Sequence, residues 1–196
     1  MIKLRSVTKS RLRKIYLARQ KSLTGEKRLA DSRRVIKRFF SKFDLENVKY
    51  LHLFLSIEKK GELDTSFLIN KLREADKTKL LIPRVNFEAD RLEHLEFGVK
   101  TRLKENTWGI IEPTGDQLIP EGKVDLVVVP LLCFDQRGFR VGYGKGFYDK
   151  FLSLCREDCK KIGLSLFGPV KEIEDIHSHD VKLDYCITPE KVWSFN

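Results

Sequence analysis

The stretch DLVVVPLLCF, residues 125–134, is the most apolar part of the sequence and decides the fold. Its apolar residues follow one another without the alternation of a half-exposed strand. A continuous run of this kind is typical of a strand that is covered on both faces, as in a parallel sheet with helices on either side. The stretch is therefore expected to lie in the middle of a sheet.

Shorter segments on either side of this stretch are expected to supply the other strands. Toward the N-terminus, YLHLFLSI (50–57), KLLIPRV (79–85) and RLEHLEF (91–97) have the length and pattern of strands. Toward the C-terminus, IGLSLF (162–167) and DYCIT (184–188) predict two more. The segment 79–85 contains a proline near its end, which we interpret as the end of that strand.

Segments with helical spacing stand between these strands. Two basic helices are predicted at about 8–23 and 25–43, a third within 61–77 and a fourth from 147 to 158. This alternation predicts an α/β fold, a three-layer α-β-α sandwich with a mostly parallel central sheet and Rossmann-like topology. No linker divides the chain, so we expect a single domain over residues 1–196. Ligands of such sheets bind beyond the carboxyl ends of the strands.

The composition indicates a charged, globular chain, with 41% hydrophobic and 34% charged residues. No segment approaches the run of about 18 apolar residues that would span a bilayer. The first residues are basic but lack the apolar region and cleavage site of a signal peptide. We therefore expect a cytoplasmic protein without a membrane partner, and we expect it to be a monomer.

The four cysteines, at positions 133, 155, 159 and 186, are too few and too scattered for a disulfide framework. Cys155 and Cys159 stand four residues apart, a spacing that predicts one face of a helix. Without a second pair or a nearby histidine cluster, this spacing makes a poor zinc site. We interpret the cysteines as small buried thiols.

The formal net charge of +10 comes from one part of the chain. Residues 1–42 carry fifteen Lys or Arg and only two acidic residues, whereas the remaining 154 residues are slightly acidic. Such a segment favours an anionic partner, and a nucleic-acid-binding protein is one interpretation. No signature of a known nucleic-acid-binding module appears in the sequence. We therefore expect no nucleic-acid partner and regard most of these cations as a solvated helical face.

A glycine-rich loop, RVGYGKGFYD at residues 140–149, follows the central apolar stretch. It fits neither well-known phosphate loop, because a dinucleotide fingerprint needs one more residue between its last two glycines and a Walker loop needs Ser or Thr after the lysine. Its parts nevertheless suit an anion. Glycines let backbone N–H groups approach a phosphate, and Arg140 and Lys145 can neutralise its charge. Asp149, in the first turn of the following helix, is a candidate oxygen ligand for Mg²⁺ or a simple helix-dipole charge.

The extended segment GFRVGYGKGFYDKFL (138–152) closely resembles the signature of the 5-formyltetrahydrofolate cyclo-ligases, also called 5,10-methenyltetrahydrofolate synthetases. The resemblance continues along most of the chain in matching order, through "FLSIEKKGELDT", "IPRV", "WGIIEP", "VVVPLLCFD" and "HDVKLDYCITPE". The segment "FGPVKEIEDIHSHD" (167–180) departs from the family, whose members usually have a Gln and a Pro there.

This resemblance implies an enzyme that uses MgATP to cyclise 5-formyltetrahydrofolate to 5,10-methenyltetrahydrofolate, with release of ADP and phosphate. In similar enzymes the formyl oxygen attacks the γ-phosphate to give an imidate phosphate. The neighbouring nitrogen 10 then attacks the activated carbon, and phosphate leaves. The resemblance thus implies ATP as co-substrate and Mg²⁺ as cofactor. A kinase or another ATP-dependent ligase built on the same loop is the alternative enzyme class.

Roles for individual residues also follow from the resemblance. Lys145 and Arg140 match catalytic positions, and Asp149 and Asp184 match the magnesium carboxylates. Residues that would bind the substrate are Leu55, Glu62, Trp108, Phe147 and Tyr148. Residues that would bind ATP are Lys9, Arg13, Arg140, Gly142, Tyr143, Gly144, Lys145, Gly146, Phe147 and Tyr148. Phe147 stands where the family often has tyrosine.

Overall fold

The computed structural model, which describes residues 7–195, contains a seven-stranded sheet whose central strand is formed by residues 126–129 of the apolar stretch. The strand order is β11-β10-β9-β6-β1-β2-β3. Its strands are β1 (Tyr50–His52), β2 (Lys79–Asn86), β3 (Arg91–Glu96), β6 (Leu126–Val129), β9 (Lys160–Leu164), β10 (Tyr185–Ile187) and β11 (Val192–Ser194). Two small two-stranded sheets accompany it, one of β4 (Leu103–Glu105) and β5 (Ile111–Pro113), the other of β7 (Cys133–Phe134) and β8 (Arg140–Val141).

The central sheet is doubly wound and mostly parallel. Strands β10, β9, β6, β1 and β2 pair in parallel, and the edge strands β3 and β11 are antiparallel to their neighbours. From β1, the chain proceeds outward to β2 on one side and to β6, β9 and β10 on the other. The order therefore reverses between β1 and β6, which is where such sheets bind ligands. The predicted α/β fold with a mostly parallel sheet is confirmed.

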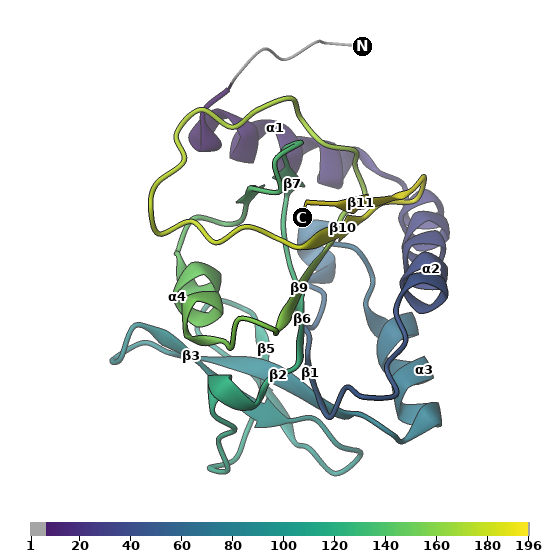
Figure 1. Cartoon of the computed structure of the whole chain (residues 1–196), viewed down its shortest axis with the longest axis vertical. Helices are drawn as coiled ribbons and strands as arrows, with labels where there is room; N and C mark the ends of the chain where they lie inside the picture. The colour runs from purple at the N-terminus through teal and green to yellow at the C-terminus, as the bar shows by residue number, and fades with distance from the viewer. Residues whose placement is uncertain (1–6, 196) are drawn as a thin grey trace.

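Helices cover both faces of the sheet. They are α1 (Lys9–Ser22), α2 (Gly25–Lys42), α3 (Ser66–Ala75) and α4 (Phe147–Leu154), with short 3₁₀ helices η1 (Glu58–Lys60) and η2 (Glu121–Lys123). Figure 1 shows α2 and α3 on one side of the strands, α4 on the other and α1 across the top. The helices predicted at 8–23 and 25–43 are confirmed. Their first turns are capped by the hydroxyls of Thr8 and Thr24.

The continuous apolar run is explained by the two helical layers. Leu126 and Val128 of β6 pack in the core beneath α2 and α3, whereas Val127 and Val129 pack in the core beneath α4. All four side chains are essentially buried. Because successive strand residues point to opposite faces, a strand with helices on both sides needs apolar residues at every position.

Three details differ from the predictions. The strand at 50–57 ends at His52, and residues 53–57 leave the sheet in irregular conformation. Strand β2 continues through Pro83 to Asn86. Proline is tolerated there because β1 pairs with β2 only as far as Leu81, so no hydrogen bond to β1 is lost at Pro83. Helix α4 ends at Leu154, so Cys155 and Cys159 do not share one helix face.

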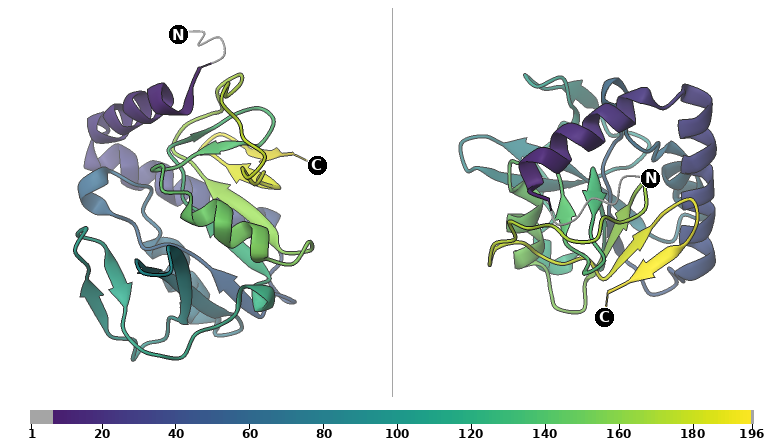
Figure 2. Two further views of the ribbon diagram at one scale, coloured as in Figure 1. Left: turned by 90° about the vertical axis from the view of Figure 1, so that its left-hand side faces the viewer. Right: turned by 90° about the horizontal axis from the view of Figure 1, so that it is seen from above.

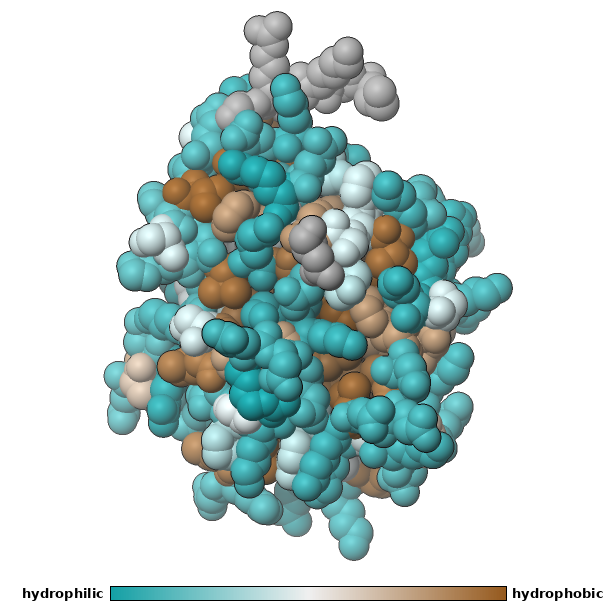
Figure 3. Space-filling model, in the orientation of Figure 1, coloured by the Kyte–Doolittle hydropathy of each residue, from teal (hydrophilic) through white to brown (hydrophobic). Residues whose placement is uncertain are grey.

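The remaining surface is mainly polar. The face shown in Figure 3 is mostly hydrophilic, with apolar residues in small separate patches. Among residues 7–195, none of the helices has the length and apolarity needed to cross a membrane. Figure 2 shows α1 toward one end of the molecule and the β4–β5 hairpin toward the other. These two elements form opposite walls of the cavity described below.

Two buried histidines under α4 are expected to make stability dependent on pH. His52 and His94 are almost fully buried, and none of their ring nitrogens has a hydrogen-bond partner among the described residues. Burial lowers the pKa of His52 well below its ordinary value and that of His94 to about 4. Below about pH 6.5 the unfolded chain therefore takes up protons that the folded chain does not, and the free energy of unfolding falls.

Urea unfolding between pH 7 and pH 4 measures this effect. We expect each histidine to contribute a loss of up to about 1.4 kcal/mol per pH unit as the pH falls below 6.5. A His52→Leu/His94→Leu variant should show a shallower pH dependence over the same range, whatever its stability at pH 7. An equally steep dependence in the variant would assign the acid sensitivity to other groups.

Candidate functional site

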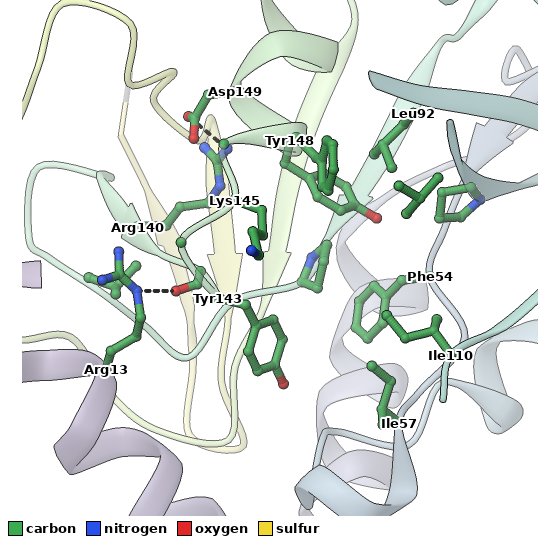
Figure 4. Close-up of a pocket in the computed structure, with 18 of the residues that line it drawn as sticks. Arg13, Phe54, Ile57, Leu92, Ile110, Arg140, Tyr143, Lys145, Tyr148 and Asp149 are labelled. Carbon is green, nitrogen blue, oxygen red and sulfur yellow. Dashed lines mark hydrogen bonds and ion pairs between the residues drawn. The ribbon is translucent and has the colours of Figure 1, made fainter. Parts of the chain in front are cut away.

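A cavity of about 830 Å³ lies at the carboxyl ends of β1 and β6. Its walls come from the segment after β1, from Pro130 after β6, from the first turns of α1, from the β4–β5 hairpin and from the glycine loop. Its volume is in the range of sites for small molecules and cofactors. In Figure 4, Arg13 and Arg140 lie on one side, apolar residues including Phe54 and Ile110 lie on the other, and Lys145 lies between them.

The glycine loop between β8 and α4 has the backbone conformation that only glycine adopts readily. Gly144 has φ +94°, and Gly146, which precedes α4, has φ +72°. A Cβ atom on Gly144 would lie 3.0 Å from Cζ of Arg13. The absence of a side chain there lets the Arg13 guanidinium rest on the loop, and Arg13 Nε donates to the Gly142 carbonyl at 2.9 Å.

Arg140 connects the glycine loop to the first turn of α4. Its guanidinium donates to Asp149 Oδ1 at 2.8 Å and to the Val181 carbonyl at 2.5 Å, and only 8% of the residue is exposed. The Val181 N–H donates to the same Asp149 oxygen at 3.0 Å. Burial lowers the pKa of Arg140, and the adjacent Asp149 carboxylate opposes that shift. Arg140 thus lines the cavity, but its charge is already paired, which makes it a positioning residue in this arrangement.

Lys145 and Lys9, two further basic residues of the cavity, differ in whether their charges are already paired with a carboxylate. Lys145 is exposed, and its ammonium lies 5.2 Å from the centre of the Trp108 ring, within range of a cation–π contact. Lys9 is ion-paired with Asp180, and its backbone N–H donates to Asp175 at 2.6 Å. Lys145 is therefore the more available charge for an anionic ligand, whereas Lys9 would have to exchange its carboxylate partner.

Glu62 is a buried carboxylate in the cavity wall, with 6% of the residue exposed. One of its oxygens accepts the Ile57 N–H at 2.6 Å, and the other accepts the Tyr143 hydroxyl. Burial raises the pKa of Glu62, and both hydrogen bonds act against that rise. The Lys60 ammonium lies 4.3 Å from the centre of the Tyr143 ring. Tyr143, predicted as an ATP contact, thus connects the glycine loop to the predicted folate carboxylate.

Flat and apolar side chains form the remaining wall. Trp108 is 45% exposed in the turn between β4 and β5, with its ring edge-to-face with Phe87 at 4.6 Å and 6.3 Å from Phe147. Leu55 also lines the cavity. The Tyr148 hydroxyl is buried without a hydrogen-bond partner among the described residues. A ring system could stack against this wall, and a polar ligand atom could satisfy the Tyr148 hydroxyl.

Comparison with known proteins identifies this combination of fold and loop. The model of the 5-formyltetrahydrofolate cyclo-ligase family matches residues 5–189. The chain belongs to the 5-formyltetrahydrofolate cyclo-ligase family. The 5-formyltetrahydrofolate cyclo-ligase of Escherichia coli (strain K12) is 29% identical over 180 residues, covering 90% of this chain and 98% of that protein.

Two further relatives agree with this assignment. The probable 5-formyltetrahydrofolate cyclo-ligase of Schizosaccharomyces pombe is 32% identical over 160 residues, covering 74% of this chain and 76% of that protein. The solved structure of Aquifex aeolicus 5,10-methenyltetrahydrofolate synthetase superimposes with a TM-score of 0.77 at 26% identity, over 96% of this chain and 93% of that one. The chain is thus an enzyme of the ligase class, and its family supports a reaction that forms methenyltetrahydrofolate.

One residue that the cyclo-ligase resemblance assigned to magnesium lies elsewhere. Asp184 precedes β10, where its carboxylate accepts the Lys161 N–H at 2.7 Å and lies 3.7 Å from the Lys161 ammonium. Because β10 is parallel to β6, this position is at the amino ends of the strands, and Asp184 does not line the cavity. The structure therefore does not bring Asp184 together with Asp149. Within residues 7–195, no group of three His, Cys, Asp or Glu side chains could hold a metal ion.

Three carboxylates of the cavity were not among the predicted site residues. Glu112, in the "WGIIEP" segment, is buried and accepts the Val85 N–H at 2.9 Å. Asp175 and Asp180 hold Lys9 from the long segment before β10. These residues lie in or beside segments that resemble the family, but nothing in their spacing indicates that they face the glycine loop.

Proposed function

We propose that the protein catalyses the ATP- and magnesium-dependent cyclisation of 5-formyltetrahydrofolate to 5,10-methenyltetrahydrofolate, with release of ADP and phosphate. The reaction would proceed through an imidate phosphate, formed when the formyl oxygen attacks the γ-phosphorus of ATP. Family membership supports the overall conversion. The observation that carries the proposal is that a cationic glycine loop and an apolar wall with a buried carboxylate open onto one cavity.

The chemistry requires two reactants to be held together and negative charge to be neutralised. An amide oxygen is a poor leaving group, whereas phosphate is a good one, so phosphorylation of the formyl oxygen activates its carbon toward nitrogen 10. Phosphoryl transfer asks a protein mainly for positioning and charge stabilisation. Lys145 supplies an available cation at the centre of the cavity, and Arg13 supplies a second one from α1.

On the ATP side, we propose that the phosphates lie along residues 142–146. Gly146 leaves the loop backbone open to close approach, Gly144 lets Arg13 lie against the loop, and the first turn of α4 directs its N–H groups toward an anion. Arg13 and Lys145 would contact the phosphates directly. Lys9 would join them after leaving Asp180. Arg140 would act through Asp149 and the loop that it holds.

Asp149 is the residue that fits a magnesium ion in this site. Both of its hydrogen bonds from described residues converge on Oδ1, so Oδ2 stays available as a ligand atom. Magnesium typically takes one or two carboxylates together with phosphate oxygens and water, so a lone carboxylate beside a nucleotide is sufficient. The ion would supply neutralisation of phosphate charge. Asp184 has no part in this proposal.

On the folate side, we propose that Glu62 accepts N–H groups of the pterin ring. A carboxylate with two oxygens suits a ring amide and its neighbouring amine. Trp108 and Phe147 would stack on the flat parts of the substrate, Leu55 would contact its apolar surface, and the Tyr148 hydroxyl would donate to one of its polar atoms. The burial of Glu62 supports this role, because its carboxylate lines a cavity wall otherwise rich in apolar side chains.

An absorbance assay tests this function. The methenyl product has an extended chromophore in the near ultraviolet that the formyl substrate lacks. We expect the absorbance to rise when protein, 5-formyltetrahydrofolate, ATP and magnesium are combined, and to stay flat when any one of them is omitted. A flat trace in the complete mixture, or ADP release with a non-folate acceptor, would contradict the proposal.

A change of Tyr143 to phenylalanine tests the link between the glycine loop and Glu62. The Tyr143 hydroxyl donates to the carboxylate and so lowers its pKa against the effect of burial. In Tyr143→Phe the pKa of Glu62 should rise further, so that less of the carboxylate is ionised at a given pH. We therefore expect the acid limb of kcat/KM to move to higher pH. Tyr50→Phe, outside the cavity, is the control, and an unmoved acid limb in Tyr143→Phe would disconnect Glu62 from activity.

The proposal also includes the organisation of the protein. The match of the family model to residues 5–189 supports a single domain over residues 1–196. We propose a monomer that acts in the cytoplasm on 5-formyltetrahydrofolate and ATP, without a nucleic-acid partner. Size-exclusion chromatography with light scattering tests the monomer, and a mass of about twice 22.9 kDa would contradict it.

A further inference from the structure

Two of the four cysteines lie side by side where α4 passes into β9. Cys155 is the C-cap residue directly after α4, and its thiol donates to the Phe151 carbonyl at 3.5 Å. Cys159 follows after a turn that is closed by its N–H bond to the Arg156 carbonyl at 3.1 Å. This turn brings the two thiols within hydrogen-bonding range of each other. Both pack in the core beneath α4.

The two thiols have different surroundings. Cys155 is partly exposed and lies near the cations Arg156 and Lys161. The hydrogen bond from Cys159, with support from these cations, lowers the pKa of Cys155. Cys159 is 1% exposed, and both its bond to Cys155 and its burial raise its pKa. Thiolate character and solvent access are the properties that make a cysteine reactive, so Cys155 is the nucleophile of this pair.

The other two cysteines have neither property. Cys133 and Cys186 are fully buried in β7 and β10. Burial raises the pKa of Cys133 to about 12 and that of Cys186 well above its ordinary value. Buried thiols of this kind are inert. Cys133 and Cys186 therefore serve as internal controls for the reactivity of Cys155.

We propose that Cys155 and Cys159 form a reversible oxidation site, at which a hydroperoxide oxidises Cys155 and Cys159 then closes an intramolecular disulfide. The geometry that supports the proposal is a partly exposed thiol hydrogen-bonded to a buried one across a short turn. Redox-sensitive cysteines are typically accessible thiolates beside a resolving thiol. The site lies beyond the last turn of α4, whereas the cavity is formed by the first turn.

The chemistry balances in two steps. The Cys155 thiolate attacks one oxygen of hydrogen peroxide, so that an S–O bond forms, the O–O bond breaks and hydroxide leaves with two electrons. The sulfur of Cys159 then attacks the sulfur of the resulting sulfenic acid; the S–S bond forms, and the oxygen leaves as water with the thiol proton. Two equivalents of a low-molecular-weight thiol reverse the reaction by thiol–disulfide exchange, which restores both cysteines.

Alkylation after peroxide treatment tests this site. The native protein is treated with hydrogen peroxide, denatured in the presence of a thiol-alkylating reagent, digested and analysed by mass spectrometry. We expect a linked Cys155–Cys159 peptide, alkylated Cys133 and Cys186, and loss of the link after treatment with dithiothreitol. A link between any other pair, or four alkylated cysteines after peroxide, would overturn the proposal.

Two matched variants separate the roles of the thiols. Cys155→Ser should abolish the link completely and leave Cys159 alkylated. Cys159→Ser should instead stop the reaction at the sulfenic acid of Cys155, which dimedone traps. Cys133→Ser is the control and should form the link as the native protein does. If Cys155→Ser still consumes peroxide at the native rate, or if dimedone labels another cysteine in Cys159→Ser, the assignment is wrong.

Discussion

Replacement of Lys145 by alanine is expected to lower kcat/KM by about 100-fold, equivalent to about 2.7 kcal/mol of transition-state stabilisation. Lys145 is the exposed cation of the glycine loop, at the centre of the cavity. Negative charge on the transferring phosphoryl group has to be neutralised by groups already in place, because water is displaced when both substrates are bound. Steady-state rates at varied ATP concentration measure this loss.

Lys150→Ala is the matched control for this variant. Lys150 is an exposed cation of α4 that pairs with Asp90 and does not line the cavity. Removal of its charge changes the net charge of the protein by the same amount but should leave kcat/KM within about twofold, as for an exposed ion pair. Equal losses in the two variants would show that general charge, and not the position of Lys145, supports activity.

Arg140→Met is expected to destabilise the fold as well as the site. The change leaves the Asp149 carboxylate without its ionic partner, and removal of one member of a buried pair usually costs 3–5 kcal/mol. Asp149 keeps some contact with solvent and its bond from Val181, so we expect a loss of about 2–3 kcal/mol. The free energy of unfolding in urea measures it. Activity should fall in parallel, because the loop and α4 lose their common anchor.

The double variant Arg140→Met/Asp149→Asn distinguishes stability from chemistry. Because it also removes the unpaired charge, it should recover much of the lost stability. It should not recover activity, because the proposed magnesium ligand is gone and the loop lacks its anchor. Recovery of activity together with stability would contradict the positioning role of Arg140 and the ligand role of Asp149 together.

Much of the fold could be predicted because single segments carried two consistent signals. The stretch at 125–134 had both continuous apolarity and a following glycine loop, and its first half forms β6, which is buried on both faces. The basic helices had regular apolar spacing, and the structure adds threonine caps at their first turns. The elements that the sequence did not predict lacked such paired features. The hairpin of β4 and β5 has strands of three residues, which are too short to show a periodic pattern.

Only some residues of the site could be recognised from the sequence. The glycine loop is continuous in sequence, so its cations and glycines could be recognised together. Asp175 and Asp180 could not be, because only the folded chain brings their segment over α1. Resemblance also paired Asp184 with Asp149, although the parallel direction of β10 places Asp184 at the other end of the strands. A shared motif shows which residues are present, but it does not show which carboxylates face the same cavity.

An isotope experiment tests whether the cavity brings the formyl oxygen to the γ-phosphorus of ATP. The protein is given 5-formyltetrahydrofolate labelled with oxygen-18 in the formyl group, together with MgATP, and the released phosphate is analysed by mass spectrometry. We predict that each inorganic phosphate carries one labelled oxygen, because the formyl oxygen leaves as part of phosphate. Unlabelled phosphate, with the label recovered in water, would contradict it.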